Sequence, residues 1–108
     1  MPTSFVNRAS KDVGTTPVLM YTTPADSKSI LIGANIANIL GSTVPFDLYI
    51  NKSGVDYYIV LGHRVTSGNN IEVMSGNKIV LDNNDTVYVK SHIPSGVDVT
   101  LSILSGVT

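Results

Sequence analysis

The chain has 108 residues, of which 14% are charged and 43% are hydrophobic, and its formal net charge is −1. This length fits one domain with its own core, and the balanced charge argues against a protein that binds nucleic acid through a basic face. Soluble domains usually carry charge on about a quarter of their residues. A surface built instead from Ser, Thr, Asn and Gly favours packing against other subunits. Cysteine is absent, so the sequence encodes no disulfide and says nothing about the redox compartment.

The sequence shows no targeting signal. Its first residues contain no apolar run of signal-peptide length, and no stretch reaches the roughly 20 apolar residues of a spanning helix. We therefore expect no contact with a membrane. Two matches to the N-glycosylation pattern, at Asn51 and Asn84, are interpreted as chance because no secretory signal accompanies them.

Residues 1–14 differ in pattern from the rest of the chain. They mix polar residues and basic groups such as Arg8 with one apolar pair, Phe5 and Val6. A frayed terminus would explain this composition. The alternative is an N-terminal arm that docks Phe5 and Val6, with Arg8 nearby, on a neighbouring subunit. The sequence thus predicts an arm over residues 1–14 and a folded domain over residues 15–108.

From residue 17 onward the apolar residues recur with a period of two, which is typical of half-buried β-strands. Eight stretches follow this pattern: 17–21, 29–40, 45–51, 55–61, 71–73, 78–81, 85–90 and 97–104. Turns rich in Gly and Asn separate them at fairly even spacing. Seven or eight short antiparallel strands predict an all-β fold, a single β-sandwich or jelly-roll-like domain, and not βαβ units.

The alternation also predicts which side chains face the core. The predicted inward residues are Phe46, Leu48, Ile50, Val55, Tyr57, Ile59, Leu61, Val87, Val89, Val97, Val99, Leu101 and Ile103. Residues 29–40 are ambiguous, because some of their apolar residues also have helical spacing. Gly33 and the β-branched isoleucines favour a strand. Its inward face would carry Ile30, Ile32, Ala34 and Ile36.

Residues 82–85, of sequence DNND, place two carboxylates and two amides in four positions. Either a calcium ion or a tight turn could use this chemistry. An EF-hand loop that began at Asp82 would need Gly at its sixth position and Glu at its twelfth, where the chain has Val87 and Ile93. Since the segment lies between two alternating stretches, we interpret it as a hairpin turn.

No motif predicts catalysis. His63 and His92 are the only histidines, and without cysteine they do not predict a zinc site. Glu72 is the only glutamate, and its place in an alternating stretch predicts an outer strand face. The sequence contains no G-x-S-x-G, P-loop or G-x-G-x-x-G pattern. We therefore predict that the protein is not an enzyme and has no catalytic residue, cofactor or metal.

Three of the five tyrosines, Tyr49, Tyr58 and Tyr88, fall on predicted outer faces. Exposed aromatic residues can stack on sugar rings or anchor a protein interface. Cross-strand packing also favours aromatic pairs. We take these tyrosines as candidate partner contacts, together with the three residues named in the arm.

The order of the segments along the chain carries a family resemblance. From Gly14 the chain reads GTTPVLMYTTPADSKSILIGANIANI, later VDYYIVLGHRVTSGNNIEVMSGNKIVLDNNDTVYVKS, and finally GVDVTLSIL. This order resembles small virion structural proteins of tailed bacteriophages. The resemblance implies a β-sandwich accessory part of the virion, such as a head decoration, a neck or collar piece or a tail attachment, and it implies no catalytic residues.

Together with the composition, the resemblance predicts a structural bacteriophage protein, a capsid decoration or cement protein that packs on the major capsid lattice. It would assemble in the cytoplasm of a bacterial host and reside in the virion. Its partners would be the major capsid protein or other virion proteins, and copies of itself, with a trimer favoured because threefold capsid sites suit trimeric cement proteins. A neck, collar or tail accessory protein stays open, as does a carbohydrate- or receptor-binding β-sandwich module.

Overall fold

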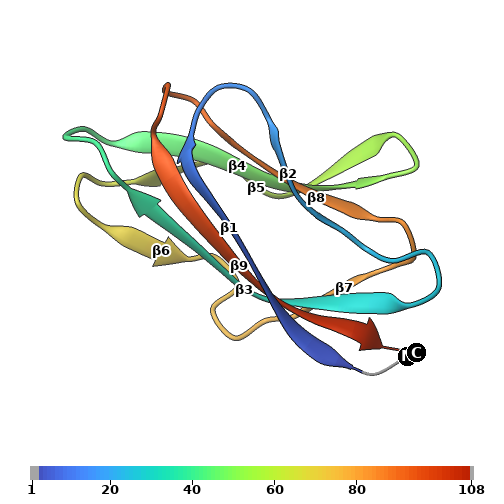
Figure 1. Ribbon diagram of the computed structural model, residues 1–108. Helices are drawn as coiled ribbons and strands as arrows, with labels where there is room; N and C mark the ends of the chain where they lie inside the picture. Colours follow the sequence, from blue (N-terminus) through green and yellow to red (C-terminus); the bar gives the residue numbers. More distant parts are fainter. Residues whose placement is uncertain (1–2, 108) are drawn as a thin grey trace.

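The computed structural model describes residues 3–107, which fold into two antiparallel sheets packed face to face (Figure 1). The strands are β1 (Ser4–Val13), β2 (Val18–Thr22), β3 (Lys28–Asn38), β4 (Val44–Lys52), β5 (Val55–Val65), β6 (Asn70–Glu72), β7 (Ile79–Leu81), β8 (Thr86–Ser91) and β9 (Val97–Val107). The predicted all-β sandwich is confirmed. There are nine strands instead of seven or eight, because the predicted arm also contributes β1. None of the described residues belongs to a helix that could span a membrane.

The strand order is that of a jelly roll. Sheet A has the order β1-β9-β3-β6, with β7 also paired to β3, and sheet B has the order β2-β8-β4-β5. The short strands β6 and β7 pair with two separate stretches of β3, so they act as two halves of one interrupted strand. Counted in this way, each sheet has four strands, which is the double-sheet, eight-stranded arrangement of a jelly roll.

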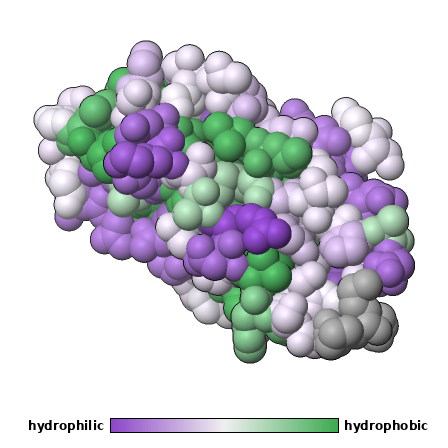
Figure 2. All heavy atoms as spheres, in the orientation of Figure 1, coloured by the Kyte–Doolittle hydropathy of each residue, from purple (hydrophilic) through white to green (hydrophobic). Residues whose placement is uncertain are grey.

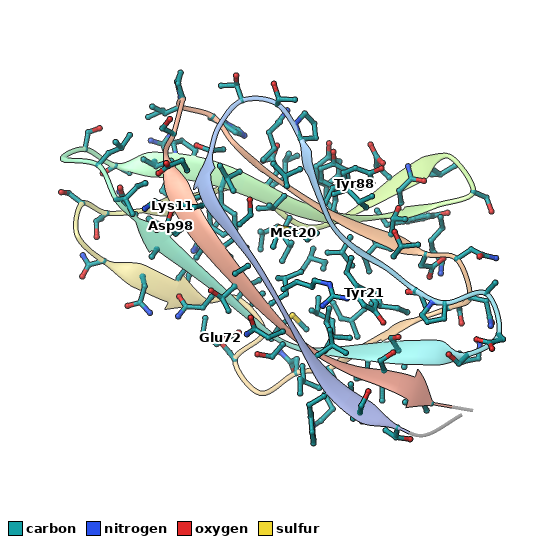
Figure 3. All side chains as sticks on the ribbon, viewed as in Figure 1. Lys11, Met20, Tyr21, Glu72, Tyr88 and Asp98 are labelled. Carbon is teal, nitrogen blue, oxygen red and sulfur yellow. The ribbon has the colours of Figure 1, made fainter. Side chains whose placement is uncertain are left out.

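The core fills the space between the two sheets, into which Met20 and Tyr21 point in Figure 3. The inward faces predicted for β4, β8 and β9 are confirmed, because their alternate apolar residues are buried. These residues are Phe46, Leu48, Ile50, Val87, Val89, Val97, Val99, Leu101 and Ile103. A strict period of two therefore identified the face of every strand that is regular and lies inside a sheet.

The inward face predicted for β3 is wrong in its first half. The register between β3 and β9 shifts between Leu31 and Gly33, which leaves Ile32 as an extra residue. Such a bulge reverses the alternation. Leu31 is therefore buried while both isoleucines beside it are only half-buried, and Ala34 and Ile36 beyond the bulge face inward as predicted.

The inward face predicted for β5 is also wrong. Tyr57 is 55% exposed and Leu61 is 68% exposed. β5 lies at the edge of sheet B, and its register against β4 shifts twice. The β4–β5 hairpin projects at the upper right of the molecule in Figure 1, in light green. An edge position and two bulges thus leave apolar side chains in solvent that an interior strand would bury.

The described part of the predicted arm lies along its own chain. β1 pairs antiparallel with β9 from Ser4 to Val13, with one irregularity after Ser10. It also comes close to β2, so it closes one side of the sandwich, seen at the front of Figure 1. Contact of this segment with a neighbouring subunit stays a prediction.

Candidate interaction surfaces

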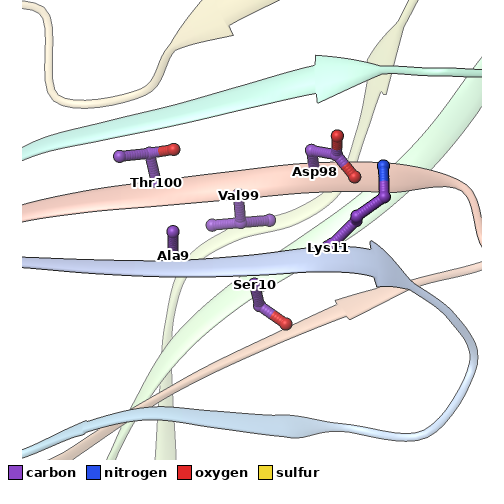
Figure 4. Close-up of a pocket in the computed structure, with 6 residues that line it drawn as sticks. All are labelled: Ala9, Ser10, Lys11, Asp98, Val99 and Thr100. Atoms are coloured by element: carbon purple, nitrogen blue, oxygen red, sulfur yellow. The ribbon is translucent and has the colours of Figure 1, made fainter.

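A shallow pocket of about 290 Å³ lies over β1 and β9 (Figure 4). It is lined by Ala9, Ser10, Lys11, Asp98, Val99 and Thr100. The carboxylate of Asp98 accepts a hydrogen bond of 2.9 Å from the backbone N–H of Asp12, so it holds the end of β1 in place. Among residues 3–107, no three His, Asp or Glu side chains gather where a metal ion could bind. The pocket is therefore a depression over two paired strands, lined by one lysine and one aspartate among small and apolar residues.

Asp47 is a buried carboxylate that the sequence did not predict. Its place between Phe46 and Leu48, which face the core, gives it the alternation of an outer residue, yet it is only 2% exposed. Its Oδ1 accepts a hydrogen bond of 2.7 Å from the N–H of Gly62 and lies 2.9 Å from Nε2 of His92, while Lys90 Nζ is 3.8 Å from Oδ2. Gly62 has a φ of 65° at the second irregularity of β5. Asp47 thus fixes this bulge, which is a structural role.

The other titratable residues singled out in the sequence also have structural partners. His63 packs edge-on against the ring of Phe46, with the centroids 5.8 Å apart. Glu72 is exposed, as predicted, and its Oε2 accepts hydrogen bonds from the N–H groups of Ala34 (2.7 Å) and Met74 (3.1 Å). These contacts tie β6 to β3 where the interrupted strand breaks.

The DNND segment forms a hairpin turn, as predicted. Asn84 has a φ of 69°, and the N–H of Asp85 donates to the carbonyl of Asp82 at 3.0 Å. The carboxylate of Asp85 accepts a hydrogen bond of 2.8 Å from the N–H of Asp82. Lys28 contacts the Asp82 carboxylate at 2.7 Å, and Lys52 contacts it at 3.0 Å and also bonds to Asp85. Lysine ammonium groups thus occupy the oxygens that a calcium ion would need.

These ion pairs shift pKa values in opposite directions. The hydrogen bond from Lys28, followed by the one from Lys52, lowers the pKa of Asp82 from its ordinary value of 3.8. The hydrogen bond to Asp85, followed by the one to Asp82, raises the pKa of Lys52 from its ordinary value of 10.5. A carboxylate whose pKa is lowered on folding stabilises the fold above its unfolded pKa, and that stability is lost as the pH falls.

We therefore expect Asp82→Asn to lower the melting temperature at pH 7 and to lower it progressively less as the pH falls through the lowered pKa of Asp82, because protonation of the wild-type carboxylate removes its ion pairs. Thermal unfolding followed by circular dichroism between pH 2 and 7 measures this difference. Asp26→Asn is the matched control, because Asp26 is exposed in a nearby turn and has no ion pair among residues 3–107. An equal decrease in melting temperature from Asp82→Asn at every pH in this range would show that the ion pairs do not stabilise the turn.

The three candidate tyrosines form one row across the outer face of sheet B. Tyr58 on β5 pairs with Tyr49 on β4, Tyr49 pairs with Tyr88 on β8, and Tyr88 pairs with Leu19 on β2. The rings of Tyr49 and Tyr88 are stacked with centroids 5.5 Å apart, and those of Tyr49 and Tyr58 are tilted with centroids 5.0 Å apart. The row thus crosses all four strands of the sheet.

The tyrosine rings contact one another closely. Tyr49 is only 7% exposed, and burial, followed by the charge of Asp56, raises its pKa above the usual value of 10.0. Tyr58 and Leu19 at the two ends of the row are about half exposed. This geometry matches cross-strand packing, one of the two interpretations left open by the sequence. A partner contact by Tyr49, Tyr58 and Tyr88 stays a prediction.

A second row crosses the outer face of sheet A and is entirely apolar. Phe5 on β1 pairs with Leu104 on β9, Leu104 pairs with Ile30 on β3, and Ile30 pairs with Val80 on β7. Phe5 is 80% exposed and Val80 is 57% exposed, while the two residues between them are half-buried. Hydrophobic side chains, in green, reach the surface beside polar ones in Figure 2. Sequence alternation could not find this row, because its members are brought together only by the pairing of distant strands.

The three residues predicted in the arm have different surroundings. Phe5 points into solvent, as just described. Val6 pairs with Ile103 and packs against the core of its own chain. The guanidinium of Arg8 lies 5.7 Å from the ring centroid of Tyr21, which is within the range of a cation–π contact. Of the three, Phe5 is therefore the side chain most available to a partner.

The comparisons with known proteins show the fold. No family model matches the chain, and no curated protein matches it. Its structure is similar to that of a protein of Bacillus endospore appendages, which form a novel family of disulfide-linked pili. The TM-score is 0.61 at 12% sequence identity, and the match covers 99% of this chain and 88% of that one. The fold is thus shared, but the disulfide linkage of those pili has no counterpart in a chain without cysteine.

A second solved structure matches less well. It is the nucleoplasmin-like N-terminal domain of Drosophila FKBP39, with a TM-score of 0.45 and 14% identity, and the match covers 98% of this chain and 92% of that one. A likeness at this level has no bearing on the fold or the function of the present chain.

Proposed function

We propose that this protein is a structural, non-enzymatic subunit that works by packing against other protein subunits. The observation that carries the proposal is the apolar row of Phe5, Leu104, Ile30 and Val80 across the outer face of sheet A. Soluble monomers rarely expose large contiguous apolar patches, and such patches usually mark interaction sites. The low charge of the chain supports the same conclusion, because charged residues are depleted at the centres of interfaces.

Within this class we favour a bacteriophage virion component, a decoration or cement protein whose partner is the major capsid protein. The order of the segments along the chain supports this choice through its resemblance to small virion proteins. The jelly-roll topology is compatible with it, since this architecture recurs in viral capsid domains. A neck, collar or tail accessory protein would use the same surfaces and is the nearest variant of the proposal.

A subunit of a self-assembling appendage is the second candidate. The fold shared with the endospore pilus protein supports it, because that protein assembles into pili. Both candidates require the same property, a rigid β-sandwich that binds copies of itself or another lattice protein. A sugar-binding module has less support, because the tyrosine rings are engaged with one another and Tyr49 is nearly buried.

Phe5→Asp should reduce the mass of the assembled protein in solution, because it places a charge on the most exposed side chain of the apolar row. Light scattering over a range of protein concentrations measures the mass. Since Phe5 makes little contact with its own chain, circular dichroism and the melting temperature should stay those of the wild type. A point substitution is a cleaner test than removal of the N-terminal segment, because β1 is paired with β9 over its length.

Ala9→Asp is the matched control. Ala9 is exposed on the same strand and pairs with Thr100, so it lies on the same face of sheet A but outside the apolar row. This variant should assemble like the wild type. A Phe5→Asp variant that assembles like the wild type would contradict the proposal that this row is the packing surface.

A further inference from the structure

β5 is the least protected of the strands at the sheet edges. An edge strand exposes N–H and C=O groups with which another strand can pair, and proteins usually protect such edges with charge or short length. β2 has five residues, β6 and β7 have three each, and β1 carries three charged residues. β5 has eleven residues, and Asp56 is the only charged residue between positions 55 and 61. Four of its side chains, Val55, Tyr57, Tyr58 and Leu61, are large, hydrophobic and exposed.

We infer that two copies of the chain pair β5 against β5 in the antiparallel direction, about a twofold axis at Val60. The inference rests on the proposed function and names one contact through which copies of the subunit assemble. In this register the numbers of facing residues add up to 120, because Val60 faces itself. Asp56 of each copy then faces Arg64 of the other, so symmetry creates the same ion pair twice.

The charges on β5 fit this register. Asp56 pairs with Asn51 across the β4–β5 hairpin and accepts a hydrogen bond of 2.8 Å from its amide. Arg64 is exposed, and in the part of the chain that the structure describes it has no acidic partner. Opposite charges directly across two antiparallel strands stabilise the pairing, and like charges destabilise it. A strand that carries one charge of each sign, four residues to either side of its centre, is complementary to itself.

The faces of the strand also match in this register. Asp56 and Tyr58 lie on the outer face of sheet B, because Tyr58 pairs with Tyr49 in the tyrosine row. Val65 pairs with the buried Val44, so Arg64 beside it also lies on the outer face. Outer side chains of one copy therefore meet outer side chains of the other. The new pairing would join the two B sheets into one continuous eight-stranded sheet.

The irregularities of β5 are compatible with this pairing. Both register shifts lie next to Val60, one on each side. About a twofold axis at Val60 the irregular stretches meet each other, and the regular flanks, residues 55–57 and 63–65, form the new ladder. Tyr58 would then lie over Gly62 of the second copy. A Cβ at Gly62 would have His92 Cε1 as its nearest neighbour, at 3.9 Å, so the side-chain position of Gly62 has no close contact within its own chain. Aromatic residues often cover edge glycines in this way.

An exchange of charges tests the inference. Asp56→Arg alone, and Arg64→Asp alone, would each place like charges opposite one another twice in the dimer. We expect each single variant to raise the dissociation constant, measured by sedimentation, by about tenfold or more. The double variant Asp56→Arg/Arg64→Asp restores opposite charges and should return the dissociation constant to near the wild-type value. Lys78→Asp, at an exposed loop residue before β7, is the control and should leave the dissociation constant unchanged.

A cysteine at the axis gives an independent test. The chain has no cysteine of its own, so Val60→Cys introduces a single thiol. In the proposed dimer the two thiols face each other, and mild oxidation should yield a covalent dimer far faster than in the Lys78→Cys variant. Equal rates in these two variants would overturn the inference.

The outcomes also separate this inference from the proposed function. An assembly that dissociates with Phe5→Asp but tolerates both single charge reversals on β5 would overturn the β5 contact alone. An assembly that dissociates with the charge reversals and recovers in the double variant, but tolerates Phe5→Asp, would support β5 and overturn the packing role of the apolar row. A wild-type chain that is monomeric throughout would overturn the β5 contact and would leave, within the proposed function, only packing on another lattice protein.

Discussion

Gly96→Ala is expected to lower the free energy of unfolding by about 1–3 kcal/mol, the usual cost of adding a methyl group where there is no room for it. A Cβ at this position would overlap Oγ of Ser91 and lie 2.8 Å from Cγ1 of Val44 and 3.0 Å from the carbonyl oxygen of Ile93. Ser91 cannot easily turn away, because its hydroxyl donates to the carbonyl of Ile93 at 2.8 Å and accepts from the Ile93 N–H at 3.1 Å.

The backbone at Gly96 is also held in place. Its N–H donates to the carbonyl of Val13 at 2.9 Å, and its carbonyl accepts from the N–H of Ile39 at 3.4 Å. These bonds connect the turn before β9 to the ends of β1 and β3. A shift of the backbone that relieved the overlap would therefore weaken contacts at three strand ends.

Gly41→Ala is the matched control for this prediction. A Cβ at Gly41 would have no atom within 4 Å, and its φ lies outside the left-handed range. Urea unfolding of the two variants should give a lower midpoint for Gly96→Ala and an unchanged or slightly higher midpoint for Gly41→Ala. Equal midpoints for the two variants would mean that the turn before β9 rearranges at little cost.

The sequence predicts the buried face of a strand wherever the alternation of apolar and polar residues holds along the whole strand. β9 alternates without interruption beside two neighbouring strands, so its four predicted inward residues are all buried. β3 and β5 obey the rule only on one side of a bulge. A bulge adds one residue and reverses the faces, and in this chain nothing in the alternation of β3 marks Ile32 as the extra residue.

Part of the candidate surface could be predicted from local turns. Ser53 and Gly54 form the tight turn between β4 and β5, and both have positive φ. Counting back from this turn places Tyr49 opposite Tyr58, as observed. Tyr88 joins the row through the pairing of β4 with β8, which are more than thirty residues apart in the chain. No local signal predicts that pairing.

The sequence predicts neither the burial of Asp47 nor the apolar row of sheet A. Asp47 has the alternation of an outer residue, and it is buried because a bulge in a neighbouring strand directs the N–H of Gly62 at it. Phe5 and Val80 lie at opposite edges of sheet A, seventy-five residues apart in the chain. They share a row because the first strand and the last strand of the chain are paired. Only the full topology contains that information.

Phe46→Ala is expected to have the largest effect on stability, a loss of about 3–5 kcal/mol, because a fully buried aromatic side chain leaves a cavity when it is removed. Phe46 is the third residue of β4, pairs with Ser91 on β8 and with His63 on β5, and contacts the ring of His63. The midpoint of urea unfolding, with an unchanged slope, measures the loss.

The chain has only two phenylalanines, and the other provides the control. Phe5 is 80% exposed, so Phe5→Ala should change stability by no more than about 0.5 kcal/mol. If the apolar row of sheet A is a packing surface, Phe5→Ala should still weaken assembly, whereas Phe46→Ala should weaken assembly only under conditions in which the fold itself is lost. Comparing the same substitution at the two positions thus separates an effect on the stability of the fold from an effect on assembly. Loss of stability without loss of assembly at Phe5 would mean that β1 needs this side chain for its own fold and that the packing surface lies elsewhere.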